Sequence, residues 1–218
     1  MSASDLRGVA EWLQGVHDRR RRVVRGAWQG VPAEVRLTLC GGTGYERTAR
    51  ERRWTEIDVK LPRGYALSLY VRRHDWMDPH YIERAAMVDL EIGDAEFDRQ
   101  FLVEAAPAAI VRMILDAPAR RWLADHDGAM LTTEQLDGVP VLRGSAPTWL
   151  GRDPITAAIE TLVGVSAAVR DAYAALEAAA LCHVGAPYRP HLDGAQPAER
   201  SALADEVELV AGLRTNRS

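Results

Sequence analysis

The stretch Val88–Glu104, VDLEIGDAEFDRQFLVE, decides the fold that we expect for this chain. Apolar residues recur on both sides of Gly93-Asp94, where a glycine followed by an aspartate turns the chain. Phe97 and Phe101 stand four positions apart, the spacing that puts two side chains on one helix face. The stretch therefore predicts a strand, a turn and a buried aromatic pair.

The acidic residues of this stretch do not have the spacing of a calcium-binding loop. Counting from Asp89, the glycine falls at position five instead of six, and Gln100 occupies position twelve, where that loop needs a glutamate. Asp89 and Glu91 alternate with apolar residues instead. We therefore expect a strand that turns its acids towards water.

Upstream of this stretch, residues 55–61 and 65–71 alternate apolar and polar side chains, and Leu61-Pro62-Arg63-Gly64 joins them. This pattern predicts a β-hairpin with one buried face. Residues 35–39 predict an earlier strand that leads into a glycine-rich turn at 40–44. That turn lacks the lysine and hydroxyl of a phosphate-binding loop, so we interpret it as a hairpin turn.

Downstream, residues 130–133 and 139–142 around Asp137-Gly138 predict a second hairpin. Pro140 cannot donate a backbone hydrogen bond, which favours an edge position for its strand.

Four segments show helical spacing of apolar residues. They are residues 4–28, residues 107–115, a helix opened by Asp116-Ala117-Pro118, and an Ala-rich helix from Asp153 to about Leu181. The predicted fold is α+β: an antiparallel sheet of hairpins packed against short helices and one long Ala-rich helix. We divide the chain into a basic amphipathic helix (1–30), an α+β core domain (31–183), and a Pro/Gly linker with an amphipathic segment (184–218).

Composition places the chain among soluble globular proteins. It has 218 residues, 47% of them hydrophobic and 27% charged, and a formal net charge of −4. Residues 1–75 hold 15 basic and 9 acidic side chains (+6), whereas residues 76–218 hold 12 and 22 (−10). We interpret this asymmetry as internal neutralisation between the halves. One lysine against 26 arginines indicates a GC-rich bacterial genome.

The chain has neither an apolar signal core nor an apolar run long enough to cross a bilayer. Cys40 and Cys182 lie far apart and outside any CxxC motif, a pattern typical of reduced thiols. We therefore expect a cytoplasmic protein without a transmembrane segment.

An arginine run near the N-terminus is the candidate polyanion-binding site. It consists of Arg19, Arg20, Arg21, Arg22 and Arg25. Beside Trp28, such a cluster could grip the phosphates of nucleic acid or an acidic membrane surface. The alternative is a solvated helix face whose positive charge balances the acidic half of the chain.

Two weaker patterns suggest metal chemistry. Asp58-Val59-Lys60 matches the acid-x-Lys of metal-dependent nucleases, in which Glu34 or Glu46 would supply the further acid. An outward charge row on an amphipathic strand explains the same triplet. His74, Asp78 and His80 could ligate a metal, although histidines in such a loop are usually just solvated. We predict no resident metal, no cofactor and no catalytic residue.

The motif Gly93-Asp94-x-x-Phe97-Asp98-x-x-Phe101, followed by Arg120-x-Trp122-Leu123, resembles a pattern in uncharacterised bacterial proteins with no established activity. There it also follows a glycine-rich hairpin and a strand that ends in Leu-Pro, as Leu61-Pro62 does here. The similarity covers about residues 35–180. It implies a compact α+β domain and transfers no catalytic residue.

The C-terminal segment predicts a last amphipathic helix. Its apolar residues are Leu203, Val207, Val210 and Leu213. Such a helix can dock on its own domain or enter a partner's groove. The function that we expect is therefore a non-enzymatic interaction or assembly module that binds a protein partner or itself. Nucleic-acid or polyanion binding is the first alternative, and a metal-dependent hydrolase is the second.

Overall fold

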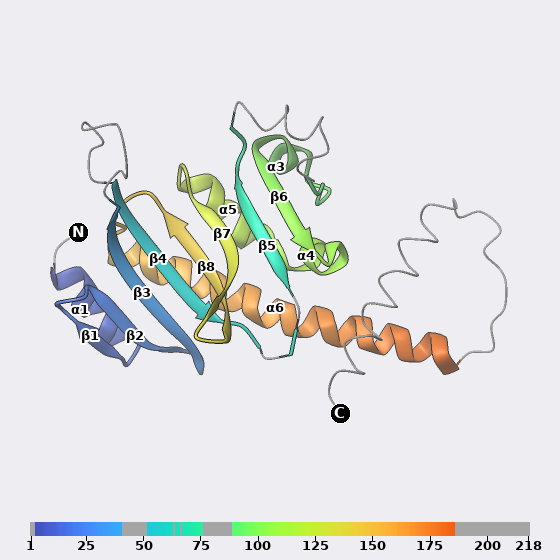
Figure 1. Ribbon diagram of the computed structural model, residues 1–218, viewed down its shortest axis with the longest axis horizontal. Helices are drawn as coiled ribbons and strands as arrows, with labels where there is room; N and C mark the ends of the chain where they lie inside the picture. The colour runs from blue at the N-terminus through green and yellow to red at the C-terminus, as the bar shows by residue number, and fades with distance from the viewer. Residues whose placement is uncertain (1–2, 41–51, 63, 66, 76–88, 186–218) are drawn as a thin grey trace. The chain divides into compact units, whose positions relative to one another are not determined.

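The structure is a computed structural model and describes residues 3–40, 52–62, 64–65, 67–75 and 89–185. Its centre is an eight-stranded sheet in the order β1-β2-β3-β4-β8-β7-β5-β6 (Figure 1). The strands are β1 (Val16–Asp18), β2 (Val23–Trp28), β3 (Val31–Cys40), β4 (Arg52–Lys60), β5 (Ser68–Arg73), β6 (Phe101–Ala106), β7 (Met130–Leu136) and β8 (Val139–Ala146). The helices are α1 (Ala3–Trp12), α3 (Ala95–Gln100), α4 (Ala108–Ile114), α5 (Ala117–Asp125) and α6 (Arg152–Gly185). Each strand pairing is antiparallel, and the predicted α+β fold is confirmed.

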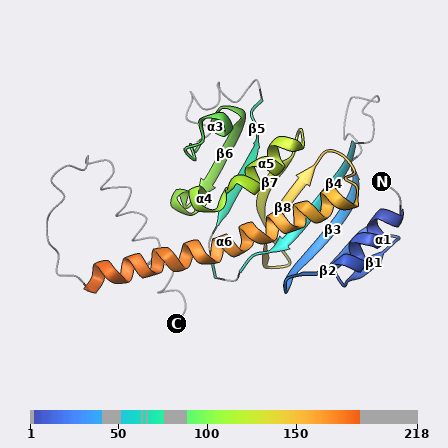
Figure 2. The same ribbon diagram turned by 180° about the vertical axis from the view of Figure 1, so that it is seen from behind.

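The chain divides into two compact units, residues 1–171 and 172–218. The sheet belongs to the first unit, and α5 and the first part of α6 cover one of its faces (Figure 2). Residues that alternate along β3, β4 and β8 point into this interface and are buried, among them Val35, Ile57 and Leu142. Burial of such side chains is worth roughly 1.5–3 kcal/mol each, so this interface is the main source of stability.

A glycine in β8 lets the two helices approach the sheet. A Cβ on Gly144 would lie 3.0 Å from Cη2 of Trp122 on α5 and 3.1 Å from Cδ1 of Leu162 on α6. Both distances are tighter than ordinary packing, so a larger residue at this position would require the Trp122 and Leu162 side chains to shift.

The predicted β7–β8 hairpin is confirmed. Asp137 and Gly138 connect the strands with φ values of 51° and 73°, and two positive φ values are the mark of a type I′ turn. The prediction that Pro140 lies on an edge strand is wrong, because β8 pairs with both β4 and β7. The pairing of β8 with β4 ends at Val141, which lies opposite Lys60, so Pro140 is just outside that ladder. The carbonyl of Pro140 still accepts a hydrogen bond from Leu61 N at 2.9 Å.

The predicted hairpin over residues 55–71 is also wrong. Both runs are strands with one buried face, but β4 pairs with β3 and β8, whereas β5 pairs with β6 and β7. Two strands therefore lie between β4 and β5. Alternation of apolar and polar residues reports which face of a strand is buried, and it carries no information about the neighbouring strand.

The helix predicted over residues 4–28 ends at Trp12, and the arginine run forms the turn between β1 and β2. The chain turns at Gln14, whose φ is 50°, and then passes close to β2. A Cβ on Gly15 would lie only 2.0 Å from the carbonyl oxygen of Arg25, so this contact requires a glycine. Because β1 and β2 belong to the main sheet, residues 1–30 are not simply an N-terminal helix.

The stretch with the Gly-Asp motif has a different local structure from the one expected. Residues 89–92 form no strand, and the Asp89 carboxylate accepts a hydrogen bond from Val103 N at 2.9 Å instead of facing water. Asp94 caps α3 through the backbone N–H groups of Glu96 and Phe97, each at 3.2 Å. The predicted Phe97 and Phe101 pair is confirmed: both rings are buried and stack with centroids 4.5 Å apart.

The helices predicted over residues 107–115, from Asp116 and from Asp153 are confirmed, whereas the last amphipathic helix predicted in the C-terminal segment lies outside the described residues. Asp116 caps α5 through Ala119 N at 3.0 Å, and α6 is the long Ala-rich helix. In the described part of the chain, no helix is long and apolar enough to cross a membrane.

Candidate functional site

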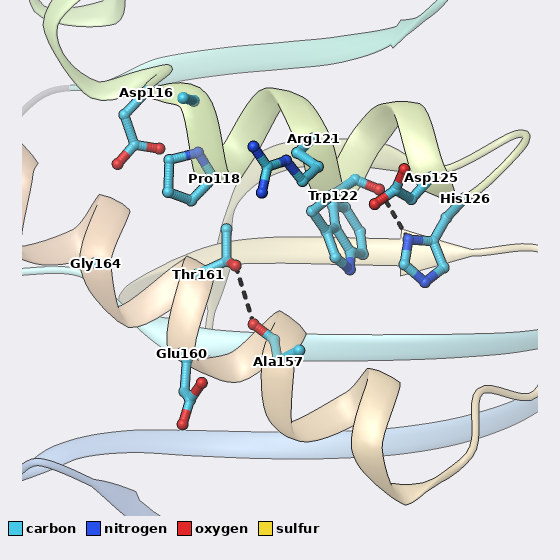
Figure 3. Close-up of a pocket in the computed structure, with 11 residues that line it drawn as sticks. Asp116, Pro118, Arg121, Trp122, Asp125, His126, Ala157, Glu160, Thr161 and Gly164 are labelled. Atoms are coloured by element: carbon cyan, nitrogen blue, oxygen red, sulfur yellow. Dashed lines mark hydrogen bonds between the residues drawn. The ribbon is translucent and has the colours of Figure 1, made fainter.

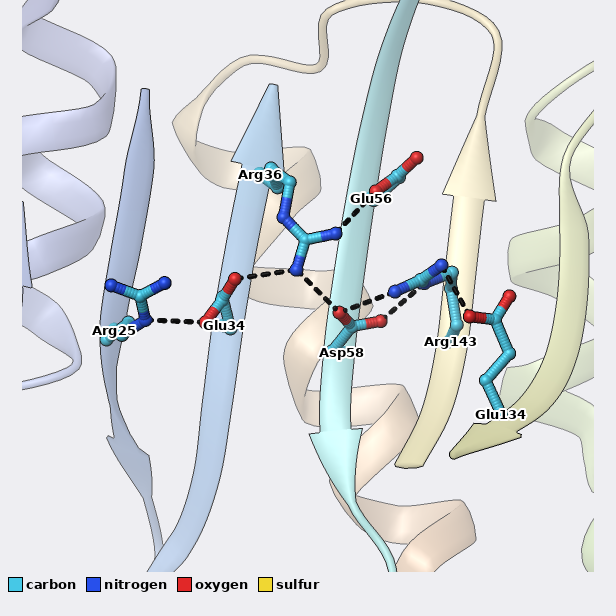
Figure 4. A network of polar contacts seen from close by, with 7 residues as sticks. All are labelled: Arg25, Glu34, Arg36, Glu56, Asp58, Glu134 and Arg143. Atoms are coloured by element: carbon cyan, nitrogen blue, oxygen red, sulfur yellow. Dashed lines mark hydrogen bonds and ion pairs between the residues drawn. The ribbon is translucent and has the colours of Figure 1, made fainter. Parts of the chain in front are cut away.

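Seven charged side chains form a continuous line across β2, β3, β4, β8 and β7, on the sheet face opposite α5 (Figure 4). We call this line the charge ladder. Its members are Arg25, Glu34, Arg36, Glu56, Asp58, Arg143 and Glu134. They come together because cross-strand neighbours share a sheet face. The register places Glu34 opposite Arg25 and Asp58, and Asp58 opposite Arg143.

Asp58 is the centre of the charge ladder and is only 4% exposed. Its Oδ1 accepts from Arg143 Nε at 2.6 Å, and its Oδ2 accepts from Arg143 NH2 at 2.9 Å. Arg36 NH2 lies 3.3 Å from the same Oδ2. Both carboxylate oxygens are therefore engaged by guanidinium groups, which is the bidentate geometry that makes such pairs strong.

The outer members extend the ladder in both directions. Arg143 NH1 forms an ion pair with Glu134 at 2.6 Å, and Arg36 donates to Glu56 at 3.0 Å and to Glu34 at 2.7 Å. Arg25 closes the other end with a 2.6 Å bond to Glu34.

The ladder perturbs the ionisation of its members. Burial opposes the charge on Glu34, but hydrogen bonds from Arg36 and Arg25 outweigh burial and lower its pKa. Burial likewise opposes the charge on Arg36, yet its bond to Glu34 and the nearby carboxylates raise its pKa. The hydrogen bond to Asp58 raises the pKa of Arg143 above its already high value. All three groups are therefore held in their charged forms at neutral pH.

This geometry does not form the predicted nuclease site. Glu34 does lie opposite Asp58, as a two-carboxylate metal site would require, but the Arg36 guanidinium fills the space between them. Lys60 takes no part in the ladder, and its carbonyl accepts a hydrogen bond from Ser166 Oγ at 3.0 Å. Glu46 lies outside the described residues. Among the residues that the structure does describe, no group of three His, Cys, Asp or Glu side chains could hold a metal.

The predicted metal ligands at the β5 end are only partly described. His74 Nε2 lies 3.3 Å from Asp89 Oδ2. Asp78 and His80 lie outside the described residues, as do the predicted partner-binding residues Leu203, Val207, Val210 and Leu213.

The structure divides the predicted polyanion site into two parts. Arg25 belongs to the charge ladder, whereas Arg19–Arg22 are exposed in the β1–β2 turn. Arg22 lies over the ring of Trp149, with its guanidinium carbon 5.2 Å from the centroid, and Arg53 of β4 lies over the same ring at 4.6 Å. Arg19–Arg22, Arg53 and Trp149 together make a surface that we call the arginine corner.

A groove of about 520 Å³ separates α5 from α6 in the first unit (Figure 3). The buried Trp122 lies in the groove wall, and its indole Nε1 has no hydrogen-bond partner. His126 Nδ1 lies 2.8 Å from the Trp122 carbonyl. A carbonyl can only accept, so this nitrogen carries the proton of the neutral ring. Thr161 Oγ1 donates to Ala157 O at 2.9 Å, away from the histidine, so the groove contains no activated hydroxyl.

Comparisons with known proteins give little further direction. No protein-family model matches the sequence, and no curated protein matches it. The crystal structure of the mycobacterial trehalose monomycolate transport factor A, TtfA, is similar over 77% of this chain and 93% of that chain. The sequence identity is 11% and the TM-score is 0.47. A likeness at this level carries no argument about function.

Sequence reasoning missed several residues of these surfaces. Arg36, Arg143 and Glu134 were not singled out, because each is an ordinary charge on an amphipathic strand until the register is known. Arg53 and Trp149 were missed because 96 positions separate them in the sequence. The only local signal was that Arg53 stands next to a tryptophan, Trp54.

Proposed function

We propose that the protein is a non-enzymatic binding module that presents the polar face of its sheet to a protein partner or to a second copy of itself. The observation that supports this proposal is the engagement of both Asp58 oxygens by Arg143 and Arg36. The most buried carboxylate of the face is thereby neutralised within the protein. Its two oxygens are occupied by guanidinium groups and are not open to a metal or a substrate.

The shape of this face also favours a binding role. No described helix lies over β3, β4 and β8 on the ladder side (Figure 1). A broad surface with charges of both signs suits recognition, because complementary charges on a partner fix its orientation and disfavour wrong partners.

The test is a measured interaction that depends on this face. Thr132 lies opposite Arg143 in the register and is partly exposed, so Thr132→Arg adds bulk and charge beside the ladder without removing any member. Thr156→Arg on α6, away from this face, is the matched control. Self-association is measured by light scattering over a concentration series. Partners captured from the source cell are purified and titrated by calorimetry.

We expect defined stoichiometry with the unmodified protein and at least tenfold weaker binding with Thr132→Arg, whereas Thr156→Arg binds normally. A strict monomer to which no purified candidate binds would overturn the proposal. Equal binding by Thr132→Arg and Thr156→Arg would show that the polar face of the sheet is not the binding surface.

A further inference from the structure

We propose that the arginine corner binds the phosphate backbone of a nucleic acid without reading its sequence. This goes beyond the proposed function, because it uses a different surface and a different class of partner. The corner gathers five guanidinium groups from two separate parts of the sequence, the β1–β2 turn and β4.

The contacts of Trp149 prepare two of these groups for phosphate. Arg22 and Arg53 both lie over its ring, at 5.2 and 4.6 Å. The attraction of a guanidinium to the face of an indole engages none of its N–H donors, which remain on the edges of the group. Those edges present the fork that pairs bidentately with phosphate oxygens. The ring is itself held in place, because Trp149 Nε1 donates to the Thr38 carbonyl at 3.4 Å.

The turn that carries the other arginines is also ordered by its own contacts. Asp18 Oδ1 accepts from the backbone N–H groups of Arg20 and Arg21 at 3.0 and 3.1 Å. Arg22 has a φ of 54°, a conformation that favours glycine, and its carbonyl accepts from Leu37 N at 3.1 Å. The turn is therefore fixed against β3, and less conformational entropy is lost when a ligand binds.

Most arginines of the corner are not paired with a carboxylate and can bind an anionic ligand. Within the described residues, Arg19, Arg20, Arg22 and Arg53 form no ion pair with a carboxylate, and the one pair of Arg21, with Asp18, is long at 3.8 Å. Arg25 differs, since its 2.6 Å bond to Glu34 commits it to the charge ladder. Four of the five arginines thus have no carboxylate partner among the described residues, so the corner carries a net positive charge on a protein whose net charge is negative.

Nucleic acid suits this surface better than a membrane. Proteins that bind bilayers peripherally combine basic residues with apolar side chains that enter the lipid. The four residues of the turn are all arginine, and the ring of Trp149 is partly buried with Arg22 and Arg53 over it, so the turn offers no apolar side chain to insert. The chemistry displayed is that of phosphate contacts, which give affinity and register on a strand without base specificity.

The salt dependence of binding has an expected size. If each of the five arginines neutralises one phosphate of a single strand, log K falls against log salt with a slope of about −3.5. Affinity then drops roughly 100-fold between 50 and 200 mM salt. Two oligonucleotides of equal length and different sequence should bind equally.

The test uses the full chain and a fluorescently labelled 20-nucleotide single-stranded DNA, with anisotropy measured over a salt series. Replacement of Arg19, Arg20 and Arg21 by Ser should reduce the slope by about 2. The pair Arg22→Lys and Arg53→Lys keeps the charge and loses the fork, so we expect at least fivefold weaker binding at constant salt. Arg170→Ser, an exposed arginine on α6, is the control and should bind normally.

No binding at 50 mM salt would overturn the inference, as would equal binding by the control and the triple variant. Binding to phosphatidylserine vesicles but not to the oligonucleotide would assign the corner to a membrane and also overturn it. None of these results bears on protein binding through the sheet face, which Thr132→Arg tests separately.

Discussion

Replacement of Arg143 by methionine should be among the most damaging single changes on the exposed face of the sheet. It removes both of the shorter bonds to Asp58, at 2.6 and 2.9 Å, and leaves that 4%-exposed carboxylate with Arg36 at 3.3 Å. Removing one partner of a buried ion pair costs about 3–5 kcal/mol. The Arg143 side chain is 14% exposed, so we expect the lower end, about 3 kcal/mol.

Urea unfolding measures this cost. With a slope of about 2 kcal/mol per molar, the midpoint should move down by about 1.5 M. The double variant Asp58→Val with Arg143→Met removes both charges and should lie within about 1 kcal/mol of the unmodified protein. Arg25→Met breaks a pair whose arginine is 56% exposed and should cost less than about 1 kcal/mol.

Two results would refute this reasoning. A midpoint shift below about 0.5 M for Arg143→Met would mean that water or Arg36 compensates the lone carboxylate. A double variant as unstable as the sum of its single changes would mean that the two residues do not act as a pair.

Four further changes test other parts of the structure. The pKa of Glu34 is lowered in the folded state, so its contribution is present above the unfolded pKa and is lost as pH falls through the folded value. The stability gap between the unmodified protein and Glu34→Gln, measured by urea unfolding from pH 7 to 3, should therefore narrow below about pH 4; a constant gap would contradict this. Gly26→Ala places a Cβ 2.6 Å from Leu13 O and should cost about 1–3 kcal/mol in thermal unfolding. Gly164→Ala in α6 meets no atom within 4 Å and should gain about 0.5–1 kcal/mol; equal effects of the two changes would contradict the packing argument. Asp98→Ala leaves the N–H groups of Ile92 and Gly93 without their acceptor and should cost about 1–3 kcal/mol; no loss in urea unfolding would mean that water replaces the carboxylate.

The sequence predicted local structure where the signal itself was local. Asp137-Gly138 has the residues that a tight hairpin turn needs, and Asp116 stands where a helix cap is required. Apolar spacing also predicted α6. The helix expected over residues 4–28 failed because its apolar spacing continued through a turn at Gln14-Gly15, which depends on a close approach to β2.

The candidate surfaces could not be predicted in this way, because both depend on register. The pairing of Asp58 with Arg143 joins strands 85 positions apart. Strand order was not readable either, since β7 and β8 insert between two strands that are consecutive in the sequence. The arginine run was visible, but Arg53 and Trp149 join it only once β3, β4 and the segment after β8 are in place.

Charge pairing alone would not fix that register. If β4 moved by two residues against β3, Arg36 could face Asp58 and Glu34 could face Lys60, and opposite charges would still be matched. The buried face is less tolerant, since a Cβ on Gly144 would lie 3.0 Å from Trp122 and 3.1 Å from Leu162, and a larger residue there requires both side chains to shift. The buried apolar face therefore sets the register of the strands. The charge ladder makes the opposite, outward face polar. This division is the reason to expect that Asp58 and Arg143 can be replaced together by apolar residues with the fold retained, while binding through that face is lost.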